Sequence, residues 1–268
     1  MRQVPSPGKG FLIGALFPPL VVGLMYLSGV KYTEFTDSAS SMTKGIVMPF
    51  LAASVVLVLL TSWLEWWGPV FREKVTAPRW LLAIPVLWVV AILVGINYDR
   101  VGQLSSSFLL WATIGTLLVG FSEEVTYRGL SIVALRGRMG EGRVWLFSTL
   151  MFSMAHASNL FLGQSFGATA VQLGYAFLLG SLLFVARRAS GLLVVVVLLH
   201  AAWDWMLWTS ESKALADPSD VLSGDPSGLQ NPIALVMLFL FAVGARALFR
   251  NPGQARDDPS GSAAGRAG

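Results

Sequence analysis

Residues 46–64 of the chain are IVMPFLAASVVLVLLTSWL, an apolar stretch without a charged side chain. A helix of about 20 residues crosses the hydrocarbon core of a bilayer, which is roughly 30 Å thick. The apolar residues follow one another without alternation, and this favours a helix over a membrane β-strand. Ile46–Leu64 is therefore predicted to be a transmembrane helix.

Seven more stretches of this kind lie on either side of it, which predicts an all-α polytopic membrane helical bundle with about eight transmembrane helices. Phe108–Phe121 is short and runs directly into charged residues. Phe11–Val30 contains Pro18-Pro19 and is long for a signal peptide, so we expect it to be retained as a span. The seven are Phe11–Val30, Trp80–Asn97, Phe108–Phe121, Val144–Leu162, Phe166–Ala186, Leu192–Trp208 and Pro232–Phe249.

The composition supports a membrane protein and argues against several other classes. Of the 268 residues, 54% are hydrophobic and 13% are charged, about half the charged share of an ordinary soluble domain. Cysteine is absent, which excludes a disulfide scaffold and a thiolate metal site. The net charge of +4 fits Lys and Arg in cytoplasmic loops, and no nucleic-acid motif is present, so no nucleic-acid partner is expected.

The distribution of basic residues predicts the orientation. With eight spans, both ends of the chain and the second, fourth and sixth loops share one side, and these segments hold most of the 19 Lys and Arg residues. Both termini are therefore expected to be cytoplasmic, in what we predict is a bacterial plasma membrane. Residues 1–250 are expected to form the bundle, residues 209–231 a flexible loop, and residues 251–268 a disordered cytoplasmic tail.

Glu123-Glu124-Val125-Thr126-Tyr127-Arg128-Gly129 places charges at the end of the fourth apolar stretch. Adjacent residues on a helix lie about 100° apart, so the two glutamates are predicted to have separate roles. Glu124 and Arg128 are four residues apart and can pair along one face, which leaves Glu123 to point elsewhere. A carboxylate in an apolar setting can act as a general base. The alternative is a plain ion pair at a helix end.

The chain has two histidines, and each lies in an apolar stretch with a neighbour on its own helical face. Phe152 lies one turn before His156, and Asp204 lies one turn after His200. Asn159 follows His156 by three residues, and helix packing is the favoured interpretation for it. Taken singly, such a histidine is more often structural. Taken with the paired glutamates, they predict a converging site that activates water.

These three motifs, E-E-x-x-x-R, F-x-x-x-H and H-x-x-x-D, resemble those of the CPBP family, which includes CAAX prenyl endopeptidases and the bacterial Abi (CAAX protease self-immunity) proteins. The resemblance covers a core at about residues 108–208. It implies a hydrolase, specifically an intramembrane endopeptidase in a helical bundle.

The resemblance also implies roles for the site residues. Glu123 matches the catalytic glutamate, and His156 joins it in activating the attacking water. His200 and Asp204 match the pair that supports the oxyanion, and Arg128 with Glu124 matches the structural and electrostatic part of the first motif. An aspartate donates to an oxyanion only when protonated, so Asp204 can instead orient His200.

Neither the residues nor the resemblance fixes the cofactor or the substrate. Glu123, His156 and His200 are the candidate ligands of a divalent metal such as Zn²⁺. The chain lacks H-E-x-x-H, so a glutamate-type site that requires no cofactor is favoured. The expected partners are the lipid bilayer and a peptide or membrane-protein substrate, with a bacterial peptide favoured over a prenylated one, and the oligomeric state stays open.

Four alternatives remain. Buried Glu, His and Asp residues are also used by transporters and proton relays. A non-catalytic protein of the same fold is the second alternative. The third is a rhomboid-like protease, suggested by Gly163-Gln164-Ser165-Phe166. The fourth is an aspartyl intramembrane protease, suggested by Tyr98-Asp99 and weakly by Leu222-Ser223-Gly224-Asp225.

Overall fold

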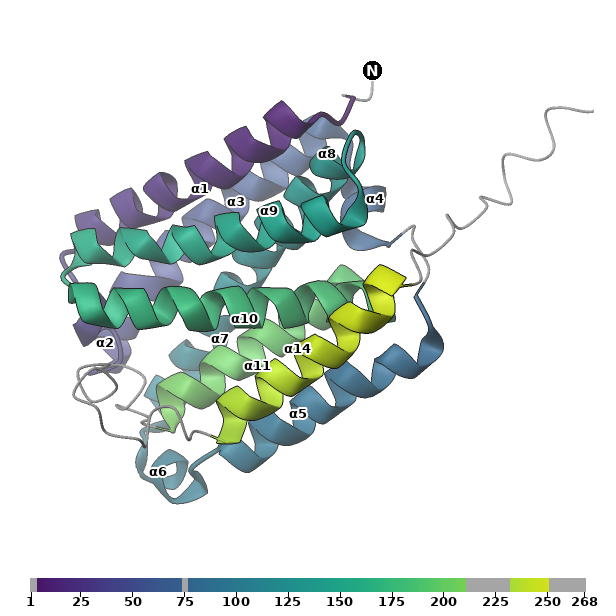
Figure 1. Ribbon diagram of the computed structural model, residues 1–268. Helices are drawn as coiled ribbons and strands as arrows, with labels where there is room; N and C mark the ends of the chain where they lie inside the picture. Colours follow the sequence, from purple (N-terminus) through teal and green to yellow (C-terminus); the bar gives the residue numbers. More distant parts are fainter. Residues whose placement is uncertain (1–3, 74–76, 211–231, 251–268) are drawn as a thin grey trace, which may run out of the picture.

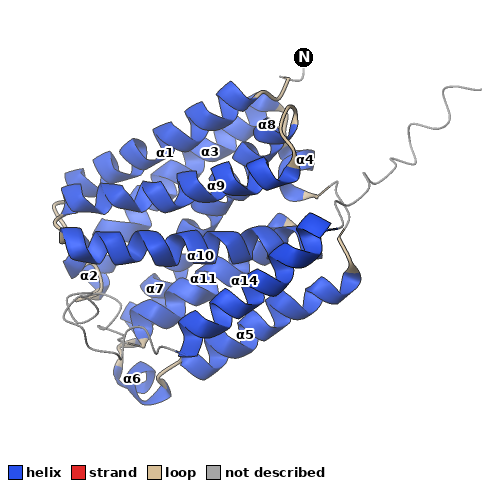
Figure 2. Ribbon diagram, viewed as in Figure 1, coloured by secondary structure: helices blue, strands red, loops and turns tan. Residues whose placement is uncertain are grey.

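The computed structural model describes residues 4–73, 77–210 and 232–250. Every regular element within these ranges is helical, which confirms the predicted all-α bundle (Figure 2). The short pairing between Arg72 and Leu192 is an isolated bridge and not a strand. Residues 211–231 of the predicted loop, and the predicted tail at 251–268, lie outside the described residues.

Each of the eight predicted stretches corresponds to a helical segment, although three of them, Phe11–Val30, Trp80–Asn97 and Leu192–Trp208, extend one or two residues beyond it (Figure 1). The α-helices are α1 (Pro7–Ser28), α2 (Ala39–Met42), α3 (Met48–Leu64), α4 (Trp67–Phe71), α5 (Ala83–Gly95), α6 (Tyr98–Gln103), α7 (Ser106–Glu124), α8 (Ile132–Arg136), α9 (Glu141–Ala155), α10 (Phe166–Ser190), α11 (Leu193–Thr209) and α14 (Pro232–Arg250). Shorter 3₁₀ or π-helical segments are η1 (Tyr32–Glu34), η2 (Thr43–Val47), η3 (Arg79–Leu82), η4 (Val125–Ser131) and η5 (His156–Leu162).

Within the described ranges, four continuous helical segments are long and apolar enough to cross a membrane. They are Pro7–Ser28, Ala39–Leu64, Ser106–Arg136 and Phe166–Ser190. Three shorter apolar helices, Arg79–Gly95, Leu193–Thr209 and Met237–Arg246, pack among them. The chain is therefore an integral membrane protein built from helices.

The fourth span is much longer than the short Phe108–Phe121 stretch expected from the sequence. The helical segment continues for 31 residues, from Ser106 to Arg136, straight through the charged motif. Glu124 and Arg128 pair inside the bundle with fully buried side chains, so the charges do not force the chain out of the apolar layer. The π-helical segment η4 forms the continuation.

At the centre of the bundle, α7 packs lengthwise against α11, while α10 packs against α9 and α14 (Figure 1). Gly120 lets α7 approach α11 very closely, because a Cβ atom at this position would lie 2.8 Å from the Val197 carbonyl oxygen. Small residues serve this purpose in packed membrane helices. The close approach brings the charged end of α7 next to His200 on α11.

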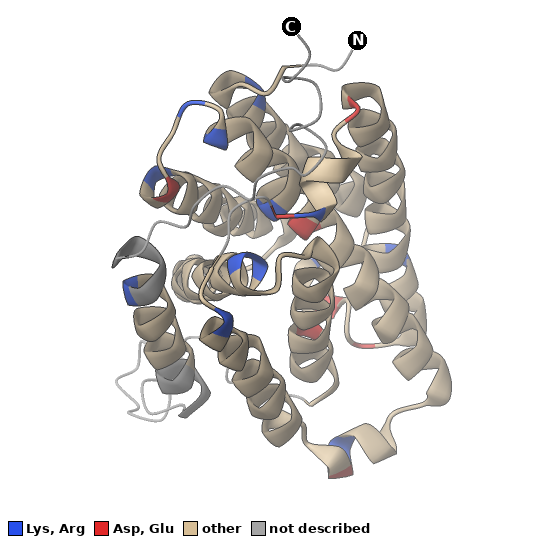
Figure 3. Cartoon of the chain, turned by 90° about the vertical axis from the view of Figure 1, so that its right-hand side faces the viewer, with Lys and Arg blue, Asp and Glu red and all other residues tan. Residues whose placement is uncertain are grey.

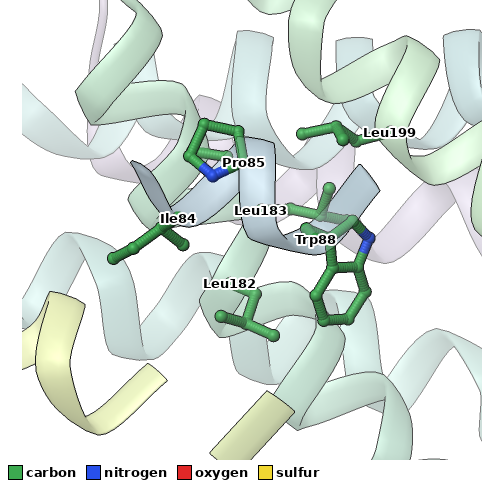
Figure 4. Close-up of a pocket in the computed structure, with 7 residues that line it drawn as sticks. Ile84, Pro85, Trp88, Leu182, Leu183 and Leu199 are labelled. Carbon is green, nitrogen blue, oxygen red and sulfur yellow. The ribbon is translucent and has the colours of Figure 1, made fainter. Parts of the chain in front are cut away.

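A small apolar crevice lies between α5, α10 and α11 (Figure 4). It contains no titratable side chain and therefore offers no acid, base or metal ligand. Its lining is Ile84, Pro85, Trp88, Leu182, Leu183, Ala186 and Leu199.

Four of the described basic segments predicted to share one side of the membrane lie at one end of the bundle. The start of α1, the end of α8, the start of α9 and the end of α10 meet there (Figure 1). Figure 3 looks towards this end, where Lys and Arg lie near the ends of several helices. The grouping agrees with the predicted topology, whereas the assignment of this end to the cytoplasm stays a prediction.

Candidate active site

The three motifs come together in the interior of the bundle. Glu123 and Glu124 end α7, Arg128 lies in η4, His156 begins η5, and His200 and Asp204 lie one turn apart on α11. The side chains of Glu124 and Arg128 are fully buried and that of His200 is nearly so, whereas Glu123 and Asp204 are each 14% exposed. The site thus has a sealed side, formed by Glu124 and Arg128, and a less buried side.

Glu124 holds the sealed side together. Its Oε1 accepts a hydrogen bond from Arg128 at 3.0 Å, as predicted from the spacing, and another from Nδ1 of His200 at 2.8 Å. A carboxylate paired with a guanidinium accepts hydrogen bonds, so Nδ1 of His200 carries a hydrogen. Glu124 therefore fixes the ring orientation of His200 and directs Nε2 towards the less buried side. The sequence prediction missed this bond.

Nε2 of His200 faces two carboxylates on the less buried side. It lies 3.5 Å from Oδ2 of Asp204 and 4.0 Å from Oε2 of Glu123. The second distance is too long for a direct hydrogen bond. Oε2 of Glu123 is itself buried and makes no hydrogen bond to any described residue. Such an oxygen can accept a hydrogen bond from a water molecule that also contacts the imidazole.

Phe152, the first residue of the F-x-x-x-H motif, joins the two histidines. Its ring centroid lies 5.1 Å from that of His156 and 5.7 Å from that of His200, both edge to face. The Arg128 guanidinium carbon lies 4.0 Å from the same centroid, an attractive cation–π distance. The carbonyl of Phe152 accepts a hydrogen bond from Nδ1 of His156 at 3.0 Å. Nε2 of His156 is not used in this bond.

Gly180 on α10 makes room for this arrangement. A Cβ atom there would lie 2.6 Å from an Arg128 guanidinium nitrogen and 2.9 Å from the Phe152 ring. Any larger residue therefore has to displace Arg128, which pairs with Glu124, and Phe152, whose ring contacts both histidines.

The candidate metal ligands Glu123, His156 and His200 are not arranged as a metal site. Among the described residues, no group of three His, Asp or Glu side chains is placed to hold an ion. Nδ1 of each histidine is engaged in a hydrogen bond, to Glu124 or to Phe152, so an ion could be bound only through Nε2 of each ring. No step of the proposed mechanism is therefore routed through a metal.

The residues behind two alternative proteases have local structural roles. Ser165, the serine of the rhomboid-like pattern, is the N-cap of α10 and accepts a hydrogen bond from the Ala168 backbone. Asp99 lies in the first turn of α6, a short helix between α5 and α7. The companion segment Leu222–Asp225 lies outside the described residues.

Asn159 connects the site to two residues that the sequence prediction missed. Its side-chain amide donates to Oε1 of Gln172 on α10 at 3.0 Å, which agrees with the favoured role in helix packing. Gln172 in turn donates to the hydroxyl of Tyr32 in η1 at 2.8 Å. Asn159 and Gln172 are 13 positions apart in the chain, and Gln172 and Tyr32 are 140 apart, so helical spacing does not predict either contact.

Taken together, the fold and the site define a helical membrane protein with a buried Glu/His/Asp centre of the kind that activates water. Residues 105–206 match the model of the type II CAAX prenyl endopeptidase Rce1-like family, which confirms the resemblance predicted from the three motifs. All six candidate site residues lie inside the matched segment. At the level of the family, the match supports a CAAX-type intramembrane protease with a peptide or protein substrate. No curated protein matches the chain.

Proposed function

We propose that this protein is an intramembrane endopeptidase that hydrolyses a peptide bond of a membrane-associated protein or peptide, with water as the nucleophile. The observation that carries the proposal is the position of Glu123. Its carboxylate faces Nε2 of His200 at 4.0 Å, outside the Glu124–Arg128 ion pair. Glu123 is thus a slightly exposed carboxylate outside that ion pair, beside the oriented imidazole of His200.

The reaction follows from this arrangement. A water molecule between Glu123 and His156 gives a proton to Glu123 while its oxygen attacks the carbonyl carbon of the substrate. The carbonyl oxygen becomes an oxyanion, which accepts a hydrogen bond from Nε2 of His200 when that nitrogen is protonated. The carbon–nitrogen bond then breaks, and the proton held by Glu123 passes to the leaving amine. One water is consumed, and a carboxyl end and an amino end are formed.

The contacts of the sealed side distinguish the roles of the two glutamates. Glu124 is bound by both Arg128 and His200, so it is the orienting carboxylate, while Glu123 is the reacting one. Exclusion of bulk water by the bundle strengthens each of these polar contacts. We further propose that the basic end of the bundle faces the cytoplasm of a bacterial cell.

The test compares the peptides present in membranes that contain the wild-type chain, Glu123→Ala or His156→Ala. We expect a set of uncut peptides to accumulate in both variants, as measured by mass spectrometry, while the amount of membrane-inserted protein is unchanged. Glu34→Ala, a change in an exposed ion pair, serves as the control. Unchanged peptide profiles in both variants would overturn the proposal. Solute or proton flux in sealed vesicles, with no cut peptide, would indicate a transporter.

A further inference from the structure

The short segment η1, which lies between α1 and α2 and outside the family match, reaches the site from one side. The ring of Tyr32 packs against Phe35 with centroids 5.4 Å apart, and Phe35 packs against Trp208 at 4.9 Å. Trp208 follows Asp204 by one helical turn on α11, so the two share a face. Phe35 therefore anchors η1 beside the part of α11 that presents Asp204.

A polar chain connects the same segment to the other side of the site. The Tyr32 hydroxyl accepts a hydrogen bond from Gln172 at 2.8 Å, and Gln172 accepts one from Asn159 at 3.0 Å. Asn159 follows His156 by three residues in η5. Tyr32 thus bridges the Asp204 side and the His156 side, next to the less buried half of the centre.

The electrostatic environment of Tyr32 agrees with this placement. Burial raises the pKa of Tyr32 to about 12, and the charges of Asp204 and Glu123 contribute to the rise, against hydrogen bonds from Gln172 and Asn159 that lower it. The hydroxyl therefore feels both carboxylates of the less buried side. It also keeps its hydrogen throughout the neutral pH range.

The hydrogen of the Tyr32 hydroxyl is available to a substrate. A tyrosine hydroxyl has one hydrogen to donate and lone pairs with which to accept. The amide nitrogen of Gln172 can only donate, and Asn159 also lowers the pKa of Tyr32 as a donor to its oxygen does. Both contacts therefore use lone pairs of the hydroxyl and orient its hydrogen away from the two amides. The Tyr32 hydroxyl is thus a neutral hydrogen-bond donor. Asp204 cannot supply one as a carboxylate, because a carboxylate only accepts hydrogen bonds.

We propose that the hydroxyl of Tyr32 donates a hydrogen bond to the carbonyl oxygen of the scissile peptide bond, and to the oxyanion that forms from it, together with His200. This inference rests on the proposed hydrolysis. Tyr32 keeps its proton throughout, and Gln172 acts as a positioning residue that holds the hydroxyl. The site is then completed by a residue from the N-terminal part of the chain, outside the matched family segment.

The experiment uses the purified full-length protein in detergent, added to membranes of cells that lack it. Products that the wild-type chain forms and Glu123→Ala does not are identified first, and the parent of the fastest is synthesised as the probe. The variants are Tyr32→Phe, Gln172→Glu and the double variant. Tyr26→Phe is the matched control, since Tyr26 lies at the end of α1 and is 71% exposed.

Loss of one oxyanion donor typically lowers kcat about 10²–10³-fold. We expect a decrease of about 10²-fold in kcat for Tyr32→Phe, with an unchanged KM and unfolding temperature. The carboxylate introduced by Gln172→Glu accepts the Tyr32 hydrogen and withdraws it from the substrate, so kcat falls there too. The double variant is expected to be no slower than Tyr32→Phe alone, because the two changes remove the same hydrogen bond.

Three results overturn the role of Tyr32 while hydrolysis stands: full activity of Tyr32→Phe, a change in KM alone, or a fall in kcat that follows a fall in unfolding temperature. Additive losses in the double variant would overturn the role of Gln172. If no product depends on Glu123, the proposed hydrolysis itself fails, and the role of Tyr32 fails with it.

Discussion

Two adjacent carboxylates in this protein have different surroundings. Glu124 is fully buried, and its Oε1 accepts hydrogen bonds from both Arg128 and His200, although its Oε2 has no partner among the described residues. Glu123 is 14% exposed, and its buried Oε2 makes no hydrogen bond to any described residue. A buried carboxylate with two charge-assisted hydrogen bonds is a structural anchor, and removal of its charge leaves a buried guanidinium unpaired. The two glutamates are therefore expected to respond differently to the same substitution.

We expect Glu124→Gln to destabilise the protein by about 3–5 kcal/mol, since Arg128 then has a buried charge without its partner. Glu123→Gln is expected to unfold at the wild-type temperature and to lose about 10²–10⁴-fold in cleavage rate, as the loss of a general base predicts. Thermal unfolding in detergent and the mass-spectrometric cleavage assay measure the two effects. Equal unfolding temperatures for the two variants would contradict this division of roles.

Spacing within one helix predicted part of this site. The i, i+4 relations of Glu124 with Arg128 and of His200 with Asp204 both appear in the structure. The bond between Glu124 and His200 joins residues 76 positions apart, and the contact of Gln172 with Tyr32 joins residues 140 apart. Such contacts depend on how the helices pack, and no periodicity in the sequence carries that information.

At the scale of the helices, close packing at particular glycines decides whether the motifs can meet. A side chain at Gly120 would collide with the backbone of α11, at 2.8 Å from the Val197 carbonyl, and backbone atoms cannot rotate away. We expect Gly120→Ala to push α7 from α11, to lengthen the 2.8 Å bond between Glu124 and His200, and to cost about 1–3 kcal/mol.

The cleavage rate of Gly120→Ala should fall together with its unfolding temperature. Gly23→Ala is the control, since a Cβ atom at Gly23 on α1 meets nothing within 4 Å. Alanine is favoured over glycine within a helix by about 1 kcal/mol, so the control should be as stable as the wild type or more so. A Gly120→Ala protein with normal stability and activity would show that the packing of α7 against α11 does not require glycine at this position.

Gly180 on α10 provides a second and independent test. Alanine there meets the guanidinium of Arg128 at 2.6 Å and the ring of Phe152 at 2.9 Å. We expect Gly180→Ala to disturb the Arg128–Glu124 pair and to lower both stability and cleavage. Gly174→Ala on the same helix has nothing within 4 Å and should lower neither, since alanine is the better helix former. Unfolding and cleavage assays on this matched pair separate a packing effect from a general effect of alanine on α10.

The all-helical class and the order of the apolar helices were predictable, because apolar runs of the right length have few alternatives in a bilayer. Their local geometry was not. The π-helical segment η4 carries Arg128 onward from α7, and the 3₁₀ segment η5 begins at His156. Both segments depart from regular α-helix at the motifs themselves, where polar side-chain contacts compete with the α-helical hydrogen-bond pattern. Turns of π-helix are frequent at functional sites.

At the scale of the whole molecule, an ionic cluster joins four helix ends at the basic end of the bundle. Arg136, at the end of α8, pairs with Glu141 at the start of α9 and with Glu73 after α4. Arg188, near the end of α10, also pairs with Glu141. Glu141 therefore connects the ends of α8, α9 and α10, which belong to helical segments that carry different parts of the candidate site.

The pKa of Glu141 predicts how this cluster responds to acid. Burial raises the pKa of Glu141, but hydrogen bonds and charges from Arg136 and Arg188 outweigh burial and place it below the ordinary value of 4.5. Because the unfolded chain then binds the proton more readily, Glu141 stabilises the fold above about pH 4.5, and this contribution is lost as the pH falls through the lower folded value.

We therefore expect Glu141→Gln to lower the unfolding temperature near neutral pH, by about 2–4 °C for each kcal/mol lost. The difference from the wild type should shrink below about pH 4.5, where the unfolded wild-type chain binds the proton, and vanish below the lower pKa of the folded state. Glu34→Gln is the control, because the Lys31–Glu34 pair is exposed and such pairs contribute little. Thermal unfolding of the three proteins between neutral and acid pH measures this. A constant difference across the range would mean that Glu141 acts through packing and not through its charge.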